Sequence, residues 1–162
     1  MFIRAAVNVM RRRNYASFLL AGGLKRAHEA LVMRLNNIFR ERFRLLGRAP
    51  RRCVEDFLQE LRGSRPSICE EPFPYAVLKA MLMGTLPIAS RVGGIPEIVK
   101  GTYAERLMFT PGCHEDMADR METVLSLSRD QLVDVGLKLR EVTLKRFNNE
   151  EVKQRLLEVF SV

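Results

Sequence analysis

The sequence contains no tryptophan, only two histidines and only three cysteines. Cys53, Cys69 and Cys113 stand singly, without the paired spacing of a zinc site, and their odd number does not suit a disulfide framework. We therefore expect a reduced, intracellular setting and no metal site. Because His28 and His114 are the only imidazoles, no Ser-His-Asp or Cys-His arrangement can be assembled with confidence, which disfavours catalysis of those kinds.

The sequence also lacks an apolar run long enough to cross a bilayer. The arginine cluster 11–13 follows the first apolar residues, whereas in a secretory signal peptide the basic residues come before the apolar run. We therefore expect no membrane span and no targeting peptide. The predicted location is the cytoplasm, and peripheral contact with the inner face of the membrane is kept as an addition to it.

Acidic residues are scarce in the first part of the chain. Residues 1–65 hold 15 Lys or Arg against 5 Asp or Glu, a net charge of +10, while residues 66–162 hold 12 against 14. Such a basic region attracts anions, among which nucleotide diphosphates, anionic lipid surfaces and nucleic acids all qualify. Few aromatic residues interleave with these arginines and no RNA-recognition or helix-turn-helix signature occurs, which disfavours nucleic acid.

The chain has the composition of a globular protein, 47% hydrophobic and 28% charged, and residues 1–162 suit a single domain. Short apolar runs alternate with helical patterns along the whole sequence. These runs predict strands at 15–22, 42–47, 65–69, 86–90 and 106–110. The helical patterns cover 24–37, 50–61, 74–83, 95–100, 115–127, 129–147 and 150–160. Because most strands are apolar throughout, we expect a parallel sheet covered on both faces, a doubly wound α/β fold.

Ligands of such folds bind beyond the carboxyl ends of the strands. The loops of interest therefore follow Gly22, Gly47, Cys69 and Ser90. The last of these loops contains the glycine pair 93–94, which allows close backbone approach to a ligand or an unusual turn, although the pair alone is a weak signal.

The loop after Cys69 predicts an anion site. Pro74 suits the first position of a helix, where its missing N–H is not needed. The N–H groups of Tyr75, Ala76 and Val77 would then point from the helix start toward a phosphate. A carboxylate at Glu71 suits a different task, accepting hydrogen bonds from the hydroxyls of whatever the phosphate carries.

Residues 70–99, EEPFPYAVLKAMLMGTLPIASRVGGIPEIV, resemble the nucleotide-sugar-binding segment of family 4 glycosyltransferases with the GT-B fold. The family pattern is Glu-x-Phe-Gly, a helix with a second Glu eight residues after the first, a Gly-x-Pro motif and a Gly-Gly-x-Pro-Glu motif. The likeness continues back through FLLAGG and FRLLGRAP and forward to the last helices, so it covers nearly the whole chain. It implies a Rossmann-like domain, the C-terminal half of the GT-B fold.

The resemblance implies a hexosyltransferase that moves a sugar from a UDP-, GDP- or ADP-sugar to a glycan or lipid-linked acceptor. The anomeric configuration is retained, and no metal or other cofactor is required. Glu71 would be the catalytic residue, facing the donor hexose. The other matching positions would bind the donor: Gly22, Arg48, Ala49, Phe73, Pro74, Tyr75, Ala76, Val77, Lys79, Gly93 and Gly94.

Lys79 departs from the family pattern because it stands where the second Glu holds the ribose hydroxyls. An ammonium offers only donors and cannot copy that bidentate contact, but it can neutralise diphosphate charge. The family's first, central strand and its N-terminal acceptor domain also have no counterpart in the sequence. We therefore expect a fragment or half-enzyme that is inactive alone, with the acceptor domain on another chain. The alternative is a non-catalytic basic module that binds nucleic acid or an anionic membrane or partner surface.

Overall fold

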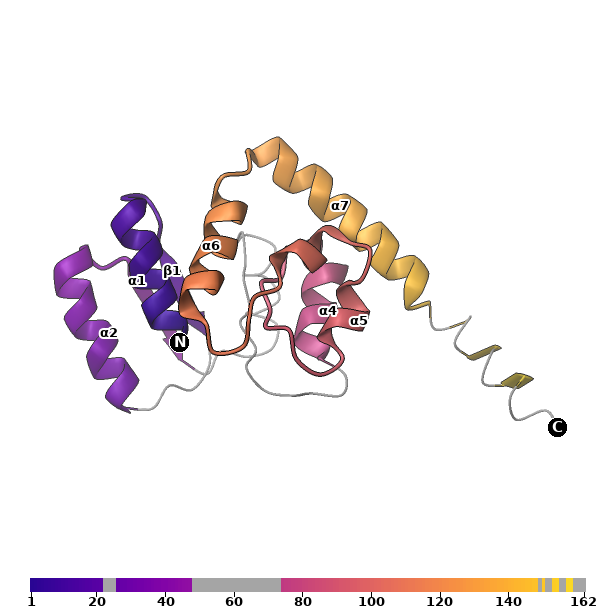
Figure 1. Cartoon of the computed structure of the whole chain (residues 1–162), viewed down its shortest axis with the longest axis horizontal. Helices are drawn as coiled ribbons and strands as arrows, with labels where there is room; N and C mark the ends of the chain where they lie inside the picture. The colour runs from indigo at the N-terminus through magenta and orange to yellow at the C-terminus, as the bar shows by residue number, and fades with distance from the viewer. Residues whose placement is uncertain (22–25, 48–73, 149, 151–152, 155–156, 159–162) are drawn as a thin grey trace.

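The computed structural model describes residues 1–21, 26–47, 74–148, 150, 153–154 and 157–158. Its elements are α1 (Phe2–Arg12), β1 (Phe18–Ala21), α2 (Arg26–Phe39), β2 (Phe43–Gly47), α4 (Tyr75–Leu82), α5 (Ile95–Val99), the 3-10 helix η1 (Tyr103–Leu107), α6 (His114–Leu125) and α7 (Arg129–Arg146) (Figure 1). The helix and strand expected at 50–61 and 65–69 lie outside these residues, as does most of the helix expected at 150–160. Among the described helices, none is long and apolar enough to cross a membrane.

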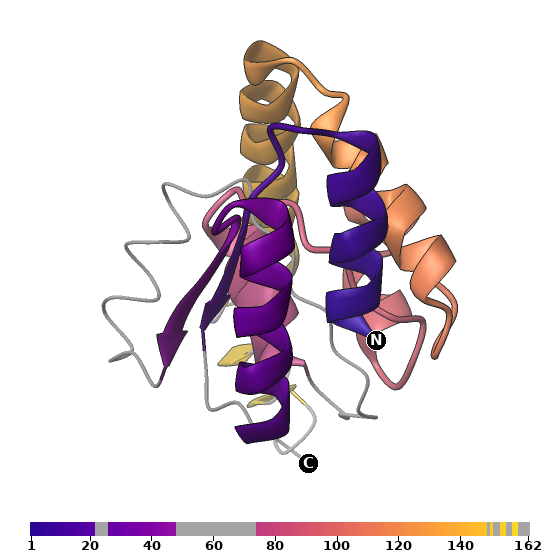
Figure 2. The ribbon, with the colours of Figure 1, turned by 90° about the vertical axis from the view of Figure 1, so that its left-hand side faces the viewer.

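β1 and β2 form a parallel pair joined by α2, which is the β-α-β unit expected from the alternating pattern. Phe18 lies opposite Phe43 in the pairing. Helices α1 and α2 lie side by side on one face of this pair (Figure 2). Met10 of α1, Val32 of α2 and Phe43 of β2 meet there in one buried cluster. The α/β class predicted from the sequence is confirmed.

α1 contributes to two cores at once. Ala6 and Met10 face the cluster over the β-strands, while Ala5 and Val9 belong to the main core of the molecule. This division follows from the helical period, because residues four apart share a face and their immediate neighbours lie about 100° away. Through its second face α1 packs against α6.

α4 packs against α7 across a pair of glycines. Gly84 follows the end of α4 with a φ of +70°, a conformation that favours glycine. A Cβ added to Gly136 of α7 would lie 2.3 Å from the Gly84 carbonyl oxygen. The two backbones therefore touch because neither residue has a side chain, and α4 is held in a fixed position against α7.

The strands expected at 86–90 and 106–110 are reduced to a parallel bridge between Ser90 and Phe109. Arg91 donates its N–H to the Phe109 carbonyl at 2.9 Å, and Phe109 donates to Ala89 at 3.0 Å. Pro87 has no N–H for a ladder, which helps to explain why the pairing is short. Residues 106–107 end the 3-10 helix η1 and do not start a strand.

Candidate functional site

α4 begins one residue later than the sequence predicts, because Pro74 was expected at the first helical position. Pro74 is the N-cap with φ −78°, and Tyr75 is the first helical residue. The Pro74 carbonyl accepts the N–H of Val77 at 3.0 Å and of Leu78 at 3.2 Å. Of the three amides expected to meet a phosphate, that of Val77 is thus already used inside the first turn.

The side chains of α4 divide into a core face and an outer face. Val77, Leu78 and Met81 are buried in the main core, which anchors the helix, and Ala80 is also buried. Tyr75 is 66% exposed, so its ring lies largely in solvent at the helix start. Lys79 and Ala76 are half-buried, and no acidic residue stands in the first turn of the helix. The positive end of the α4 dipole therefore has no carboxylate of its own first turn to neutralise it.

The glycine pair after Ser90 forms a tight link between the parallel bridge and α5. Gly93 has a φ of +52°, in the left-handed region that favours glycine, and Gly94 is the N-cap of α5. Val92 donates its N–H to the Ser90 carbonyl at 2.9 Å and accepts from Ile95 at 3.2 Å. The unusual turn expected at this pair is confirmed, and its side-chain-free backbone lies at the carboxyl end of the bridge strand.

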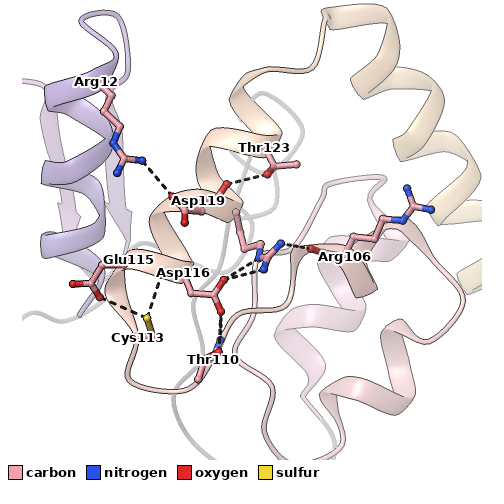
Figure 3. Close-up of polar contacts among 9 residues, drawn as sticks. Arg12, Arg106, Thr110, Cys113, Glu115, Asp116, Asp119 and Thr123 are labelled. Carbon is pink, nitrogen blue, oxygen red and sulfur yellow. Dashed lines mark hydrogen bonds and ion pairs between the residues drawn. The ribbon is translucent and has the colours of Figure 1, made fainter.

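A second loop leaves the same edge after Phe109 and is fixed by Asp116, a residue that the sequence reading missed (Figure 3). One carboxylate oxygen of Asp116 accepts the N–H of Thr110 at 2.7 Å and its hydroxyl at 2.9 Å. The other oxygen meets the Arg120 guanidinium at 2.9 Å. A signal was available, because Asp116 stands at the third helical position of α6, where acidic residues are favoured.

The pKa of Asp116 lies below its ordinary value of 3.8. Burial raises this pKa, but the hydrogen bonds from Thr110 and the charge of Arg120 together outweigh the effect of burial. The carboxylate is therefore ionised at neutral pH and holds the loop that follows Phe109.

α6 is also tied to α1 by ion pairs. Arg12 meets Asp119 at 3.2 Å on the surface (Figure 3), and Arg13 donates to Glu122 at 2.8 Å in a half-buried position. The other Glu122 oxygen is buried and has no hydrogen-bond partner among the residues that the structure describes. These contacts join the first helix of the chain to the loop-bearing part of the molecule.

The structure thus places part of the predicted site. Pro74 to Val77 and Lys79 lie on α4, Gly93 and Gly94 lie before α5, and the two helices share the main core through residues such as Val77 and Ile95. The remaining candidates lie outside the described residues: Gly22, Arg48, Ala49, Glu71 and Phe73. No cluster of three or more His, Cys, Asp or Glu that could hold a metal occurs in the described part of the chain.

Known structures share this arrangement. HepE from Anabaena in complex with UDP superposes with a TM-score of 0.76 at 19% identity, over 98% of this chain and 44% of HepE. Sucrose-phosphate synthase from Thermosynechococcus elongatus gives 0.74 at 21% identity, over 99% and 41%. TarM from S. aureus, in a complex that contains UDP, gives 0.78 at 18% identity, over 99% and 32%. The fold is therefore that of GT-B glycosyltransferases, and the chain spans less than half of each.

The sequence itself matches the family described as "Glycosyl transferases group 1" over residues 1–127. This region includes β1, β2, the start of α4 and the glycine pair before α5. The chain belongs to the group 1 glycosyltransferases, which confirms the resemblance seen in residues 70–99. The comparison with curated proteins gave no match.

Proposed function

We propose that this chain is the donor-binding half of a retaining glycosyltransferase. The complete enzyme transfers a hexose from a UDP-, GDP- or ADP-sugar to a glycan or a lipid-linked acceptor. The observation that carries the proposal is the α4 start at Tyr75, which lies inside the region that matches the group 1 family. A helix start without acidic residues in its first turn suits a diphosphate.

A UDP-sugar is the first donor to test, because HepE, which has the same fold, was crystallised with UDP-glucose. In the proposed complex the amides at the α4 start bind the diphosphate, and Gly93 and Gly94 let the backbone approach the sugar phosphate. Glu71 faces the hexose, and Lys79 contributes positive charge. The nucleoside lies near Gly22 and the backbone of 48–49.

The proposed reaction uses no metal ion and takes place in the cytoplasm. An acceptor-binding N-terminal domain completes the enzyme, and the length of the neighbours supports this, since the chain spans 44% of HepE. Transfer assayed in the completed enzyme with and without a chelator tests the metal-free reaction. Loss of transfer with the chelator, restored by a divalent cation, would contradict it.

Calorimetric titration of the full chain with UDP, GDP, ADP and the corresponding sugar nucleotides tests donor binding. We expect measurable binding of one nucleotide diphosphate. The proposal would be wrong if none of these nucleotides gave binding heat or a ligand-observed NMR signal. This outcome must hold both for the chain and for a reconstituted two-domain form.

Two substitutions at Tyr75 separate a backbone contact from a side-chain contact. Tyr75→Pro removes the first amide of α4 at a position where proline is favoured, whereas Tyr75→Ala keeps the amide and removes the ring. Loss of one hydrogen bond to a charged phosphate costs about 1.5 to 3 kcal/mol, so Tyr75→Pro should weaken nucleotide binding by roughly ten- to a hundredfold relative to Tyr75→Ala. Arg129→Pro, at the first position of α7, is the matched control and should leave binding unchanged.

A pair of glycine variants tests the second loop. Gly93 and Gly101 both have a positive φ, +52° and +73°, and they lie at opposite ends of α5. Alanine at either position should cost about 1 kcal/mol of folding stability. Only Gly93→Ala should also weaken donor binding. Equal donor affinity in the two variants would remove this loop from the proposed site.

A further inference from the structure

Arg91 stands where the buried run before the glycine pair ends. Every residue from 85 to 90 is buried, and Arg91 is the first exposed residue after them. Its N–H donates to the Phe109 carbonyl at 2.9 Å, beside the parallel bridge of Ser90 and Phe109, so its backbone is held in place. The left-handed turn at Gly93 follows two residues later. Arg91 therefore lies at the carboxyl end of the bridge strand, where ligands of α/β folds bind.

The start of α4 lies at the same edge of the molecule. Thr85 donates its N–H to the Ala80 carbonyl at 2.8 Å, so the chain turns back directly after α4. In a β-α-β unit the helix carries the chain back from the end of one strand to the beginning of the next, so residues 85–90 run opposite to α4. Val77, in the first turn of α4, and Ala89, near the end of this run, belong to the same core. The first amides of α4 and Arg91 are therefore both at the edge proposed for the donor.

The charge of Arg91 is not neutralised by another residue in the part of the chain that the structure describes. Neither an ion pair nor a side-chain hydrogen bond joins its guanidinium to any of these residues. Two carboxylates border this edge. Glu97 is exposed in the first turn of α5, while Asp116 already binds Thr110 and Arg120. The guanidinium of Arg91 is therefore available to an anionic ligand.

We propose that the Arg91 guanidinium binds the diphosphate of the donor nucleotide, at the phosphate that carries the sugar. The inference rests on the proposed function, because it adds a cation to the site in which the α4 amides and the glycine pair receive the donor. Those backbone groups are uncharged, and the Val77 amide already bonds the Pro74 carbonyl at 3.0 Å. They cannot neutralise a nucleoside diphosphate, which carries more than one negative charge at neutral pH. A guanidinium supplies positive charge and fits two phosphate oxygens with two parallel hydrogen bonds.

The chemistry of Arg91 favours the diphosphate over the other parts of the donor. A guanidinium only donates hydrogen bonds, whereas a pair of sugar hydroxyls is better held by a carboxylate, which accepts from both. The place of Arg91, two residues before Gly93, puts it beside the backbone proposed to meet the sugar phosphate. With Lys79 on α4, it gives the site one cation from each of two elements. Arg91 should therefore make the chain prefer nucleoside diphosphates to monophosphates.

Calorimetric titration of the full chain with UDP and with UMP tests this role. We expect Arg91→Gln to lower the affinity for UDP roughly tenfold and the affinity for UMP much less, because the lost contact is to the second phosphate. Arg91→Lys should keep part of the preference for UDP, since it retains the charge but not the forked hydrogen bonds. Arg129→Gln on α7 is the matched control. It removes the same charge from another exposed arginine and should leave both affinities unchanged.

Two results would overturn the role of Arg91 alone. One is a parent chain that binds UDP together with an Arg91→Gln variant that binds UDP as tightly as Arg129→Gln does. The other is an equal loss of affinity for UDP and UMP, which would indicate general attraction and not a contact with the second phosphate. A parent chain that binds no nucleotide, even in a reconstituted two-domain form, would overturn the proposed function and this inference together. Because the Arg91 side chain is exposed, the melting temperature should stay unchanged in all three variants.

Discussion

At the residue scale, Lys79 is the departure from the family pattern that bears on the proposed donor site. It is half-buried on α4, one helical turn after Tyr75. An ammonium at this position offers donors to phosphate oxygens but no acceptor for two ribose hydroxyls. The chain should therefore discriminate weakly between ribose and deoxyribose in the bound nucleotide.

We expect Lys79→Glu to add ribose recognition, because a carboxylate can accept from both hydroxyls. Titration with UDP and deoxy-UDP measures the change, and the preference for UDP should rise by roughly tenfold, as a charged hydrogen bond is worth about 1.5 kcal/mol or more. Lys79→Gln controls for loss of the positive charge. Unchanged or weaker affinity for UDP in Lys79→Glu would count against a ribose contact at this position.

Asp116 gives the fold a dependence on acidic pH. Its folded pKa is lower than 3.8, so protonation is harder in the folded than in the unfolded state. The stabilisation by Asp116 is therefore complete at pH values above the ordinary pKa and is lost as the pH falls through the range below that pKa.

Asp116→Asn should lower the free energy of unfolding by about 1 to 2 kcal/mol at neutral pH. Urea unfolding of both proteins across the acid range should show this difference shrinking, and a constant difference would contradict it. Asp119→Asn, an exposed neighbour, is the control.

At the element scale, the contact between Gly84 and Gly136 decides how α4 lies on α7. Alanine at Gly136 gains about 1 kcal/mol of helix propensity, but its Cβ would meet the Gly84 carbonyl at 2.3 Å. The carbonyl is a backbone atom and the Cβ is fixed directly to the backbone of α7, so the two backbones must move apart.

We expect Gly136→Ala to destabilise the protein by about 1 to 3 kcal/mol, as overpacking does. Thermal unfolding measures the loss, with Leu137→Ala, at an exposed position of the same helix, as the control. Donor affinity should fall as well, because the start of α4 moves with the helix. A melting temperature at or above that of the parent would show that the helices can repack.

Arg42 holds the ends of two helices. Its guanidinium donates to the Met10 carbonyl in the last turn of α1 at 3.1 Å and to the Arg13 carbonyl just after that helix at 2.9 Å. It also donates to the Phe39 carbonyl at the end of α2 at 3.1 Å. Asn36 completes the junction, since its side-chain amide exchanges two hydrogen bonds with the backbone of Phe43. Carbonyls at helix ends have no partner within the helix, so these donors replace water there.

Arg42→Met should cost roughly 2 to 4 kcal/mol, because it leaves several half-buried carbonyls without a donor. Arg42→Lys should recover only part of the lost stability, since an ammonium cannot reproduce the forked hydrogen bonds of the guanidinium. Chemical denaturation of these variants is compared with that of Arg44→Met, since Arg44 is an exposed arginine of β2, which begins directly after Arg42. Equal stability of Arg42→Met and Arg44→Met would refute the role of Arg42.

At the scale of the whole molecule, the chain spans 44% of HepE and 41% of sucrose-phosphate synthase. We expect these 162 residues to bind a sugar nucleotide but to transfer no sugar without an acceptor-binding domain. Release of nucleotide diphosphate, measured with and without that domain, tests the expectation. Full activity of the chain alone would contradict it.

Prediction from sequence succeeded where the signal is local. Pro74 indicated the start of α4, and the glycines at 93–94 indicated an unusual turn, because both residues restrict or free φ directly. It failed for Arg42 and Gly136. Apart from Phe39, the partners of Arg42 stand 26 to 32 residues away in the chain, and the partner of Gly136 stands 52 residues away. No local pattern marks such contacts.

The sequence by itself determined the α/β class, the family and, to within one residue of Pro74, the start of α4, because these depend on periodicity, apolar runs and a motif of consecutive residues. Only the tertiary structure decided that the Val77 amide is hydrogen-bonded within the first turn of α4. It also decided that Asp116 holds the loop beside the glycine pair, and that several apolar side chains of α2 stay exposed. Each of these depends on which segments meet in space, and that is set by the packing of the whole chain.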